Sequence, residues 1–392
     1  MIKKRIASID IFRALTMLLM VFVNDLWTLH NIPEWLKHTE AREDGMGFSD
    51  VIFPFFLFIV GLSIPFALQS RFQKAENWQE ILFHIFSRAF ALIVMGLFLV
   101  NYQYFRSDTS FQYRMYWKIA MVSAFFLIWN DYKTKKIFFF FHVWILQAAG
   151  VTLLAALFWY FKGGSPEKPE WWMRPHWWGI LGLIGWSYLL GSLIYLIAGN
   201  RIFFTSLVLL FFYLLNAQEF LKIGKFHHIK LLISASNYAL VTSGMITTIL
   251  YIRLKNHKQI FLFPAILFLL AAIFVIYGFQ TRPLWGISKI LATPSWVALS
   301  TALSLTVFSI LYLITDIFKF TRWAFLILPA GRSALTTYLL PVIVYAIFYR
   351  YLKLIPYEYR NSVSGLTKSF LFALSIILLT GILEKLKVKI RI

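Results

Sequence analysis

Cysteine is absent from the 392-residue sequence. Without a thiol the chain can form no disulfide bond, use no thiolate nucleophile and offer no sulfur ligand to a metal. Histidine could still bind a metal, but the loop pair His227 and His228 has no Asp or Glu close by in the sequence to complete a site. A metal site is therefore not expected.

Charged residues are also scarce. Asp, Glu, Lys and Arg make up 14% of the chain and apolar residues 60%, whereas an ordinary soluble domain has about 25% charged residues. The mean hydropathy is +0.70, and apolar windows of about 20 residues, long enough for a helix to cross the hydrocarbon layer, recur along the whole chain. The sequence predicts an all-α polytopic membrane protein in which residues 1–392 form a single transmembrane domain without a separate soluble domain.

About twelve transmembrane helices are expected from these windows. Their predicted ranges are 8–29, 48–70, 81–102, 115–130, 137–161, 177–198, 202–221, 230–252, 260–279, 295–317, 323–348 and 368–386. Pro329 and Gly331 should break the eleventh helix. Such a break is tolerated at membrane depth only inside protein or beside a cavity.

Acidic residues are fewer than basic ones, 17 against 38, and the formal net charge is +21. The basic residues are scattered among the predicted loops rather than gathered on one soluble face, so nucleic acid is not an expected partner. Anionic lipid headgroups are the simpler partner for these loops, and a polyphosphate ligand is the alternative.

Basic residues at the two ends of the chain favour one orientation. Three precede the first span and four lie at or beyond the end of the last: Lys3, Lys4, Arg5, Lys385, Lys387, Lys389 and Arg391. We therefore expect both termini on the cytoplasmic side, with His38 and Lys289 on the opposite side.

Polar residues within the first predicted span share one face. A charge near the bilayer centre costs at least about 2.5–3.5 kcal/mol, so such residues tend to face a partner or a cavity. At about 100° per residue, Asp10, Arg13 and Asn24 lie on one stripe that covers roughly 21 Å of helix. The stripe indicates either a functional surface or an Asp10–Arg13 pair that locks the helix end, with Asn24 bonding another helix.

Four further residues are singled out in the spans. Asp50 opens the second span, where exposed backbone amides favour a carboxylate, so capping alone would explain it. Gly61, on the same face, would allow another helix to approach closely. Arg88 and Arg332 lie in the third and eleventh spans. Few acids are available to pair with them, which favours a bound ligand. Near Arg332, exposed backbone amides could also bind an anion.

The loop after the first span, KHTEAREDGMG, places His38 beside Glu40, Glu43 and Asp44. A histidine in such a loop is either simply solvated or catalytic. Histidine suits acid–base chemistry because its ordinary pKa is about 6.5.

Several segments of the chain resemble the heparan-α-glucosaminide N-acetyltransferase-like family of transmembrane acyltransferases. In order, they are SIDIFRALTMLLMVFVN, a KH pair, DVIFPFFLFIVGLSI, RAFALIVMGLFLVN, ISKILATPSWVALSTALSLTVFSILYLITD and PAGRSALTTYLLP. The resemblance implies transfer of an acetyl group from cytosolic acetyl-CoA, as co-substrate, to an amino sugar of glucosamine or cell-wall type on the far side. It also suggests a bacterial inner membrane as the location, and it allows a homodimer.

The resemblance assigns roles to specific residues. His38 and Asn24 would be catalytic, with His38 as base or acyl carrier and the Asn24 amide as a donor to the developing oxyanion. Supporting roles would fall to Asp10, Arg13 and Asp50, and acetyl-CoA would be bound by Arg88, Lys289 and Arg332. The acidic loop around His38 would attract a cationic acceptor.

A secondary transporter of N-acetylglucosamine or a related sugar is the alternative function. Many spans, intramembrane arginines and a broken helix suit a substrate pathway, but the two halves of the chain show no convincing self-similarity of the kind expected for inverted repeats. A purely structural scaffold would leave the intramembrane charges unexplained.

Overall fold

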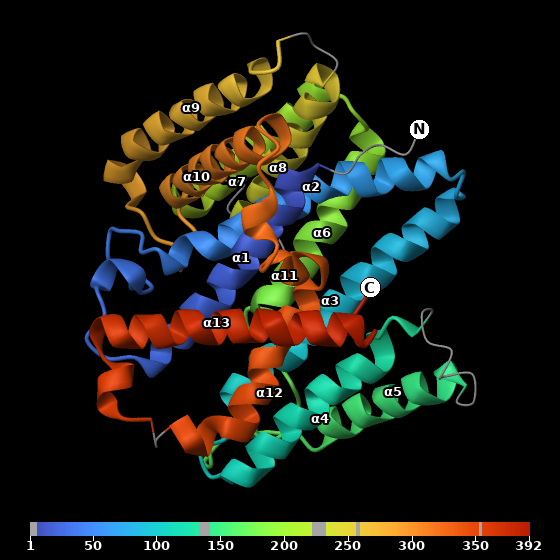
Figure 1. Ribbon diagram of the computed structural model, residues 1–392, viewed down its shortest axis with the longest axis vertical. Helices are drawn as coiled ribbons and strands as arrows, with labels where there is room; N and C mark the ends of the chain where they lie inside the picture. Colours follow the sequence, from blue (N-terminus) through green and yellow to red (C-terminus); the bar gives the residue numbers. More distant parts are fainter. Residues whose placement is uncertain (1–5, 133–141, 222–232, 256–258, 353–354) are drawn as a thin grey trace. The chain divides into compact units, whose positions relative to one another are not determined.

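The computed structural model describes residues 6–132, 142–221, 233–255, 259–352 and 355–392, and helices dominate it (Figure 1). The α-helices are α1 (Ala7–Asp25), α2 (Ser49–Gln73), α3 (Trp78–Asn101), α4 (Phe111–Trp129), α5 (Val143–Trp159), α6 (Gly179–Ala198), α7 (Ile202–Leu221), α8 (Ala235–Leu254), α9 (Leu262–Trp285), α10 (Pro294–Tyr312), α11 (Leu328–Arg332), α12 (Ala334–Leu352) and α13 (Ser362–Lys385). Within the described ranges the only sheet pairs β1 (Gly163–Gly164) with β2 (Pro169–Glu170) in antiparallel register. The predicted all-α class is confirmed.

Short helical segments connect or extend these helices. The 3-10 turns are η1 (Leu26–Thr28), η2 (Glu34–Leu36), η3 (Tyr102–Tyr104), η8 (Arg322–Ala324) and η9 (Tyr357–Arg360), and η7 (Leu313–Ile317) is a π-helical turn. Asp316 of η7 accepts the backbone N–H groups of Ala7 and Ser8, at 3.0 and 2.8 Å. This carboxylate therefore caps the first turn of α1, whose amides have no partner within the helix.

Seven helices in the described part of the chain are long and apolar enough to cross a membrane. They are Ala7–Thr28, Ser49–Gln73, Trp78–Tyr104, Gly179–Ala198, Leu262–Trp285, Pro294–Ile317 and Ser362–Lys385, and three shorter apolar helices are Val143–Trp159, Ile202–Gln218 and Ala334–Phe348. The more polar α4 and α8 belong to neither group. Each predicted span contains a helix, although residues 137–141 and 230–232 of two predicted spans lie outside the described residues.

The eleventh predicted span is broken, as expected. It divides into α11 and α12 at Ser333, whose backbone leaves the helical region with φ −127° and ψ 48°. The break comes after Pro329 and Gly331 rather than at them. Pro329 occupies the first turn of α11, where the missing N–H leaves no helical bond unmade.

The chain divides into two compact units, and the first comprises Met1–Thr16, Pro33–Ala89 and Ile184–Phe325. In this unit α9 and α10 lie side by side (Figure 1). Helices α2 and α8 meet through glycines, because a Cβ atom at Gly61 would lie 1.9 Å from the Val241 carbonyl oxygen. The close helix approach predicted for Gly61 is confirmed.

The second unit comprises Met17–Ile32, Phe90–Leu183 and Leu326–Ile392. Here α4 and α5 lie side by side (Figure 1), and Trp117 of α4 stacks on Phe98 of α3 with 6.0 Å between ring centroids. The C-terminal segment is bound within the same unit, since the Ile390 N–H donates to Thr336 Oγ1 at 3.1 Å.

Candidate active site

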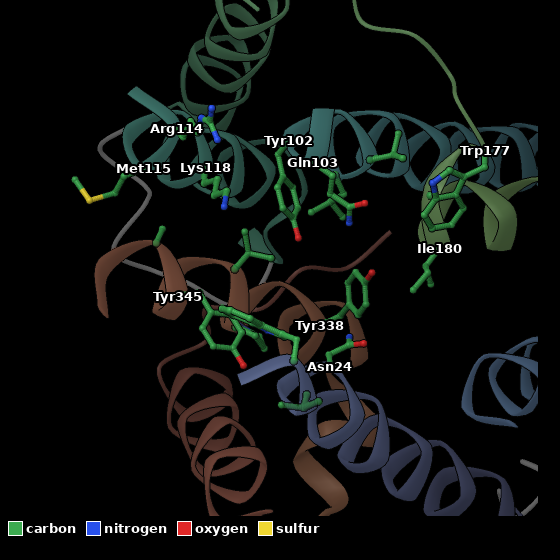
Figure 2. Close-up of a pocket in the computed structure, with 18 of the residues that line it drawn as sticks. Asn24, Tyr102, Gln103, Arg114, Met115, Lys118, Trp177, Ile180, Tyr338 and Tyr345 are labelled. Carbon is green, nitrogen blue, oxygen red and sulfur yellow. The ribbon is translucent and has the colours of Figure 1, made fainter. Parts of the chain in front are cut away.

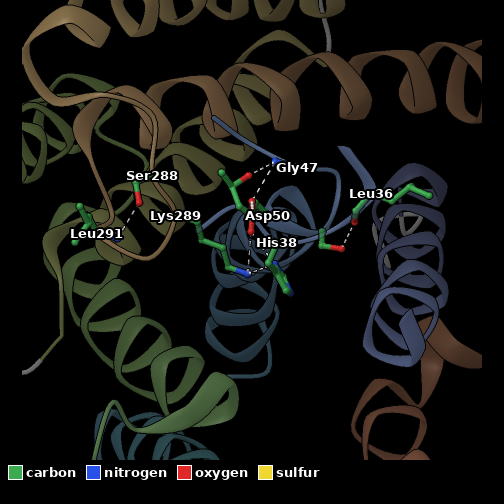
Figure 3. A network of polar contacts seen from close by, with 9 residues as sticks. Leu36, His38, Gly47, Asp50, Ser288, Lys289 and Leu291 are labelled. Carbon is green, nitrogen blue, oxygen red and sulfur yellow. Dashed lines mark hydrogen bonds and ion pairs between the residues drawn. The ribbon is translucent and has the colours of Figure 1, made fainter. Parts of the chain in front are cut away.

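His38 and Asp50 form a hydrogen-bonded pair in the first unit (Figure 3). His38 Nδ1 lies 2.7 Å from Asp50 Oδ1. His38 belongs to the loop that follows η2, and Asp50 belongs to the first turn of α2. The imidazole side chain is 51% exposed and the carboxylate only 1%. The pair thus consists of an accessible ring oriented by a buried anion.

The Asp50 carboxylate is also hydrogen-bonded to the backbone of the loop that carries His38. Its Oδ2 atom accepts the backbone N–H of Thr39 at 3.0 Å and that of Gly47 at 3.1 Å. Because these bonds complete the partners of a buried charge, they offset the cost of its desolvation. Asp50 therefore holds this loop against α2 and orients His38, but it does not cap the helix, because the N-cap of α2 is Phe48 and has no side-chain cap bond.

Lys289 joins this pair from the loop between α9 and α10 (Figure 3). Its Nζ lies 3.6 Å from Asp50 Oδ1 and 3.2 Å from His38 Nδ1. Burial lowers the pKa of Lys289, and the attraction of Asp50 opposes that change without cancelling it. Since one Nδ1 atom serves one bond at a time, we take the shorter contact to Asp50 as the imidazole N–H bond and the Lys289 contact as electrostatic.

In this arrangement the Nε2 atom of His38 is available to react with a substrate. An imidazole that donates Nδ1–H to a carboxylate has its lone pair on Nε2, which can accept a proton or attack an acyl group. An oriented base beside a buried carboxylate is the arrangement used by many general-base catalysts.

Asp44 attaches the acidic loop to the loop that carries Lys289. Its carboxylate accepts bonds from Arg282 Nε at 2.8 Å and from the Ile287 N–H at 2.7 Å. The Arg282 and Ile287 hydrogen bonds lower the pKa of Asp44. Asp44 is therefore engaged in holding the loops, while Glu40 and Glu43 are exposed.

Asp10 and Arg13 form the ion pair that their spacing allowed. Arg13 Nη1 lies 3.3 Å from Asp10 Oδ1, and Nη2 donates to Ser63 Oγ of α2 at 2.8 Å. Both residues belong to the first unit. Their contacts connect α1 with α2 and support the structural interpretation of this part of the stripe.

Asn24 lies in the second unit, where it lines a cavity of about 540 Å³ (Figure 2). The cavity is also lined by residues of α3, α4, α6 and α12. An exposed side-chain amide at such a wall can donate to a bound oxygen atom. The structure thus places Asn24 at the wall of this cavity, and its catalytic role stays a prediction.

Asp25, the neighbour of Asn24, is a polar centre that was not expected from the sequence. It is 1% exposed, and it binds Lys368 Nζ at 2.8 Å and Ser369 Oγ at 2.6 Å, both on α13. The Tyr345 hydroxyl of α12 also donates to it. An acid at the end of an otherwise apolar span is the signal that could have indicated it.

The two arginines predicted to bind acetyl-CoA lie in different units. Arg88 stands 4.9 Å from the centroid of the Tyr188 ring, and its buried Nε has no hydrogen-bond partner in the described structure. Arg332, at the end of α11, is exposed, and none of the ion pairs among the described residues involves it. Lys289 instead contacts His38 and Asp50, and its donor-binding role stays a prediction.

No group of three or more His, Asp or Glu side chains in the described ranges is arranged to hold a metal ion.

Part of the chain is similar to known proteins. Residues 5–171 match the family model described as heparan-alpha-glucosaminide N-acetyltransferase, catalytic. Over 104 residues the chain is 36% identical to heparan-alpha-glucosaminide N-acetyltransferase of Homo sapiens and 35% identical to that of Mus musculus. These alignments cover 26% of this chain and 14% of each relative's length. Residues 5–171, which include His38, Asn24 and Asp50, are thus similar to the catalytic part of this acetyltransferase family, which confirms for that segment the resemblance found in the sequence.

Proposed function

We propose that the protein is a transmembrane N-acetyltransferase that moves an acetyl group from cytosolic acetyl-CoA to an amino sugar at the extracytoplasmic side of a bacterial inner membrane. The His38–Asp50 pair carries this proposal, because an accessible imidazole fixed by a buried carboxylate lies within the segment matched to the family's catalytic model. Residues 1–392 form a single acyltransferase domain in this proposal, with both termini in the cytoplasm.

The proposed reaction begins with the free amine of the sugar. His38 Nε2 takes a proton from the amine as the new N–C bond forms at the acetyl carbonyl carbon, and the C–S bond to coenzyme A then breaks. The thiolate that leaves is protonated, and the Asn24 amide stabilises the negative charge on the carbonyl oxygen. In a second route His38 Nε2 first attacks the acetyl carbonyl carbon and the C–S bond breaks to release coenzyme A, and the amine then attacks the acetyl group and displaces the imidazole.

The donor would be bound through its phosphates and its pantetheine arm. Arg88 and Arg332 are the proposed partners for these groups, since guanidinium groups bind phosphate in a bidentate manner. Lys289 contacts His38 Nδ1 and Asp50, so in this proposal it meets the acyl end of the donor rather than its nucleotide end.

The decisive experiment compares His38→Ala with a matched histidine variant. His30→Ala removes another exposed histidine, one that stacks on Tyr357 with 5.7 Å between centroids and is outside the His38 pair. We expect His38→Ala to lose acetyl transfer from labelled acetyl-CoA to glucosamine by about 10²–10⁴-fold or more. His30→Ala should retain it.

Two outcomes would contradict the proposal. Wild-type rates in a folded His38→Ala protein would exclude this site. Movement of N-acetylglucosamine across vesicles without consumption of acetyl-CoA would instead favour the transporter. Incubation with labelled acetyl-CoA alone separates the two routes, since only the acetyl-histidine route leaves label on the protein.

A further inference from the structure

The cavity beside Asn24 is positively charged (Figure 2). Its charged lining residues are Lys118 and Arg114, both on α4, and none of the described residues that line it is Asp or Glu. Arg114 Nη2 donates to the carbonyl oxygens of Arg106 and Ser107, at 2.8 and 3.1 Å. These bonds fix the Arg114 guanidinium, and no carboxylate among the described lining residues compensates its charge.

Lys118 points into the space between Tyr102 and Tyr345 (Figure 2). Its ammonium group lies 4.7 Å from the centroid of the Tyr102 ring, and no ion pair among the described residues includes it. A ring face stabilises a half-buried ammonium only in part. An anionic ligand in the cavity would complete its interactions, because charge-assisted hydrogen bonds are the strongest that such a group makes.

The remaining polar and aromatic groups suit a carbohydrate. Tyr338 and Tyr345 lie near Asn24, with Lys118 and Tyr102 across the cavity from them and Trp177 at one end (Figure 2). Aromatic faces combined with a few convergent hydroxyl and amide groups provide both stacking and hydrogen bonds to a small polar ligand. The cavity volume of about 540 Å³ lies within the range of small-molecule sites.

We propose that this cavity binds the acceptor as an anionic amino sugar, with Lys118 holding a phosphate or carboxylate group of the sugar and Arg114 adding to the positive field. This inference rests on the proposed function, because Asn24, the proposed donor to the acetyl carbonyl oxygen, lines the same cavity. In the proposed orientation Asn24 lies near the extracytoplasmic end of α1, the side from which the acceptor arrives.

A binding experiment tests the inference without turnover. The thermal stability of the purified protein is measured against increasing glucosamine, glucosamine 6-phosphate and muramic acid, in which the sugar carries a carboxylate. We expect the two anionic sugars to stabilise the wild type at concentrations roughly 10- to 100-fold lower than glucosamine. Lys118→Met should remove this preference, and Lys118→Arg should keep it.

The chain offers a matched control for Lys118. Lys162, in the same unit, also stands over a tyrosine ring, 5.2 Å from the centroid of Tyr113, but it does not line the cavity. Lys162→Met should retain the preference for anionic sugars. Equal stabilisation by neutral and anionic sugars in the wild type, or the same loss in Lys162→Met, would overturn the inference.

Steady-state kinetics then distinguish acceptor from donor. Lys118→Met should raise the KM for glucosamine 6-phosphate by roughly 10- to 100-fold and leave the KM for acetyl-CoA unchanged. A rise in the KM for acetyl-CoA instead would assign the cavity to the donor's phosphates and overturn the inference. If the wild type acetylates none of the sugars, the proposed function fails, and the binding experiment alone decides whether the cavity prefers anionic sugars.

Discussion

Asp50 serves two purposes, and they can be separated by mutation. It orients His38, and it also accepts the N–H groups of Thr39 and Gly47. The Asp50→Asn variant keeps the size of the side chain but removes the charge that fixes the Nδ1–H of the imidazole. We expect the kcat for acetyl transfer to fall by about 10²-fold or more, because proton transfer by a positioned base contributes about 10²–10⁴-fold.

Ser49→Ala is the control for Asp50→Asn. The buried Ser49 hydroxyl donates to the Leu36 carbonyl oxygen, so its loss loosens the same loop without touching His38. Both variants should lower the thermal stability, but only Asp50→Asn should reduce kcat strongly. Equal effects on kcat would show that Asp50 acts through loop stability alone.

Lys289 should affect the pH dependence of the reaction. Its charge lies 3.2 Å from His38 Nδ1, where in the proposed function it meets the acyl end of the donor. The wild type should lose activity at high pH as Lys289 gives up its proton, and Lys289→Met should lack this basic limb of the pH–activity profile. Because burial lowers the pKa of Lys289, the basic limb should begin at lower pH than an exposed lysine would give.

Lys37→Met provides the comparison for Lys289→Met. Lys37 is in the same loop as His38 and pairs with Glu34 at 2.7 Å. Its removal changes the net charge equally but should leave the basic limb of the profile in place. Loss of the basic limb in both variants would attribute the effect to the general field of the protein.

At the scale of helices, the contact between α2 and α8 depends on the absence of side chains. A methyl group at Gly61 would meet the Val241 carbonyl oxygen at 1.9 Å, and backbone cannot move aside as a flexible side chain can. We expect Gly61→Ala to lower the free energy of unfolding by about 1–3 kcal/mol, the usual range for overpacking. Thermal unfolding in detergent would measure the loss.

Gly45→Ala is a matched glycine variant. The nearest atom to its added Cβ would be Thr39 Cγ2 at 3.5 Å, an ordinary contact. It should change the stability little. If Gly61→Ala is as stable as Gly45→Ala, the helices can separate at no cost, and the close approach is not a stabilising feature.

Helices could be predicted from the sequence better than the site could. Apolar windows of membrane length locate each helix because the bilayer sets its length, and the Gly61 contact follows from position on a helix face. The break at Ser333 could not be placed, because Pro329 is compatible with a first helical turn as well as with a break. The local sequence does not decide between these two positions of Pro329.

The parts of the site that come from distant segments were beyond sequence reasoning. Lys289 was expected to bind the donor, and its contact with His38, 251 residues away, depends on tertiary packing. The Asp25 network likewise joins α1 to α12 and α13. Residue types and spacing identify candidates within a segment, whereas the pairing of candidates is decided by the fold.

For the whole molecule, the orientation in the membrane is open to direct measurement. The chain has no cysteine, so single cysteines report their own accessibility. Cysteines that replace the exposed Glu40 and Ile290 should react with an impermeant reagent from the extracytoplasmic side. A cysteine that replaces the exposed Lys74, in the turn between α2 and α3, should react only after permeabilisation of the inner membrane. The reverse pattern would place His38 in the cytoplasm.

The cap of α1 by Asp316 has a consequence for the synthesis of the chain. The amide of Ala7 and its acceptor are 309 residues apart, and a ribosome adds about 5–20 residues per second. The first helix therefore waits roughly 15–60 s for its cap. His38 and Asp50, only 12 residues apart, can pair early, whereas Lys289 follows His38 by 251 residues. A nascent chain thus carries the histidine pair without its lysine for roughly 10–50 s.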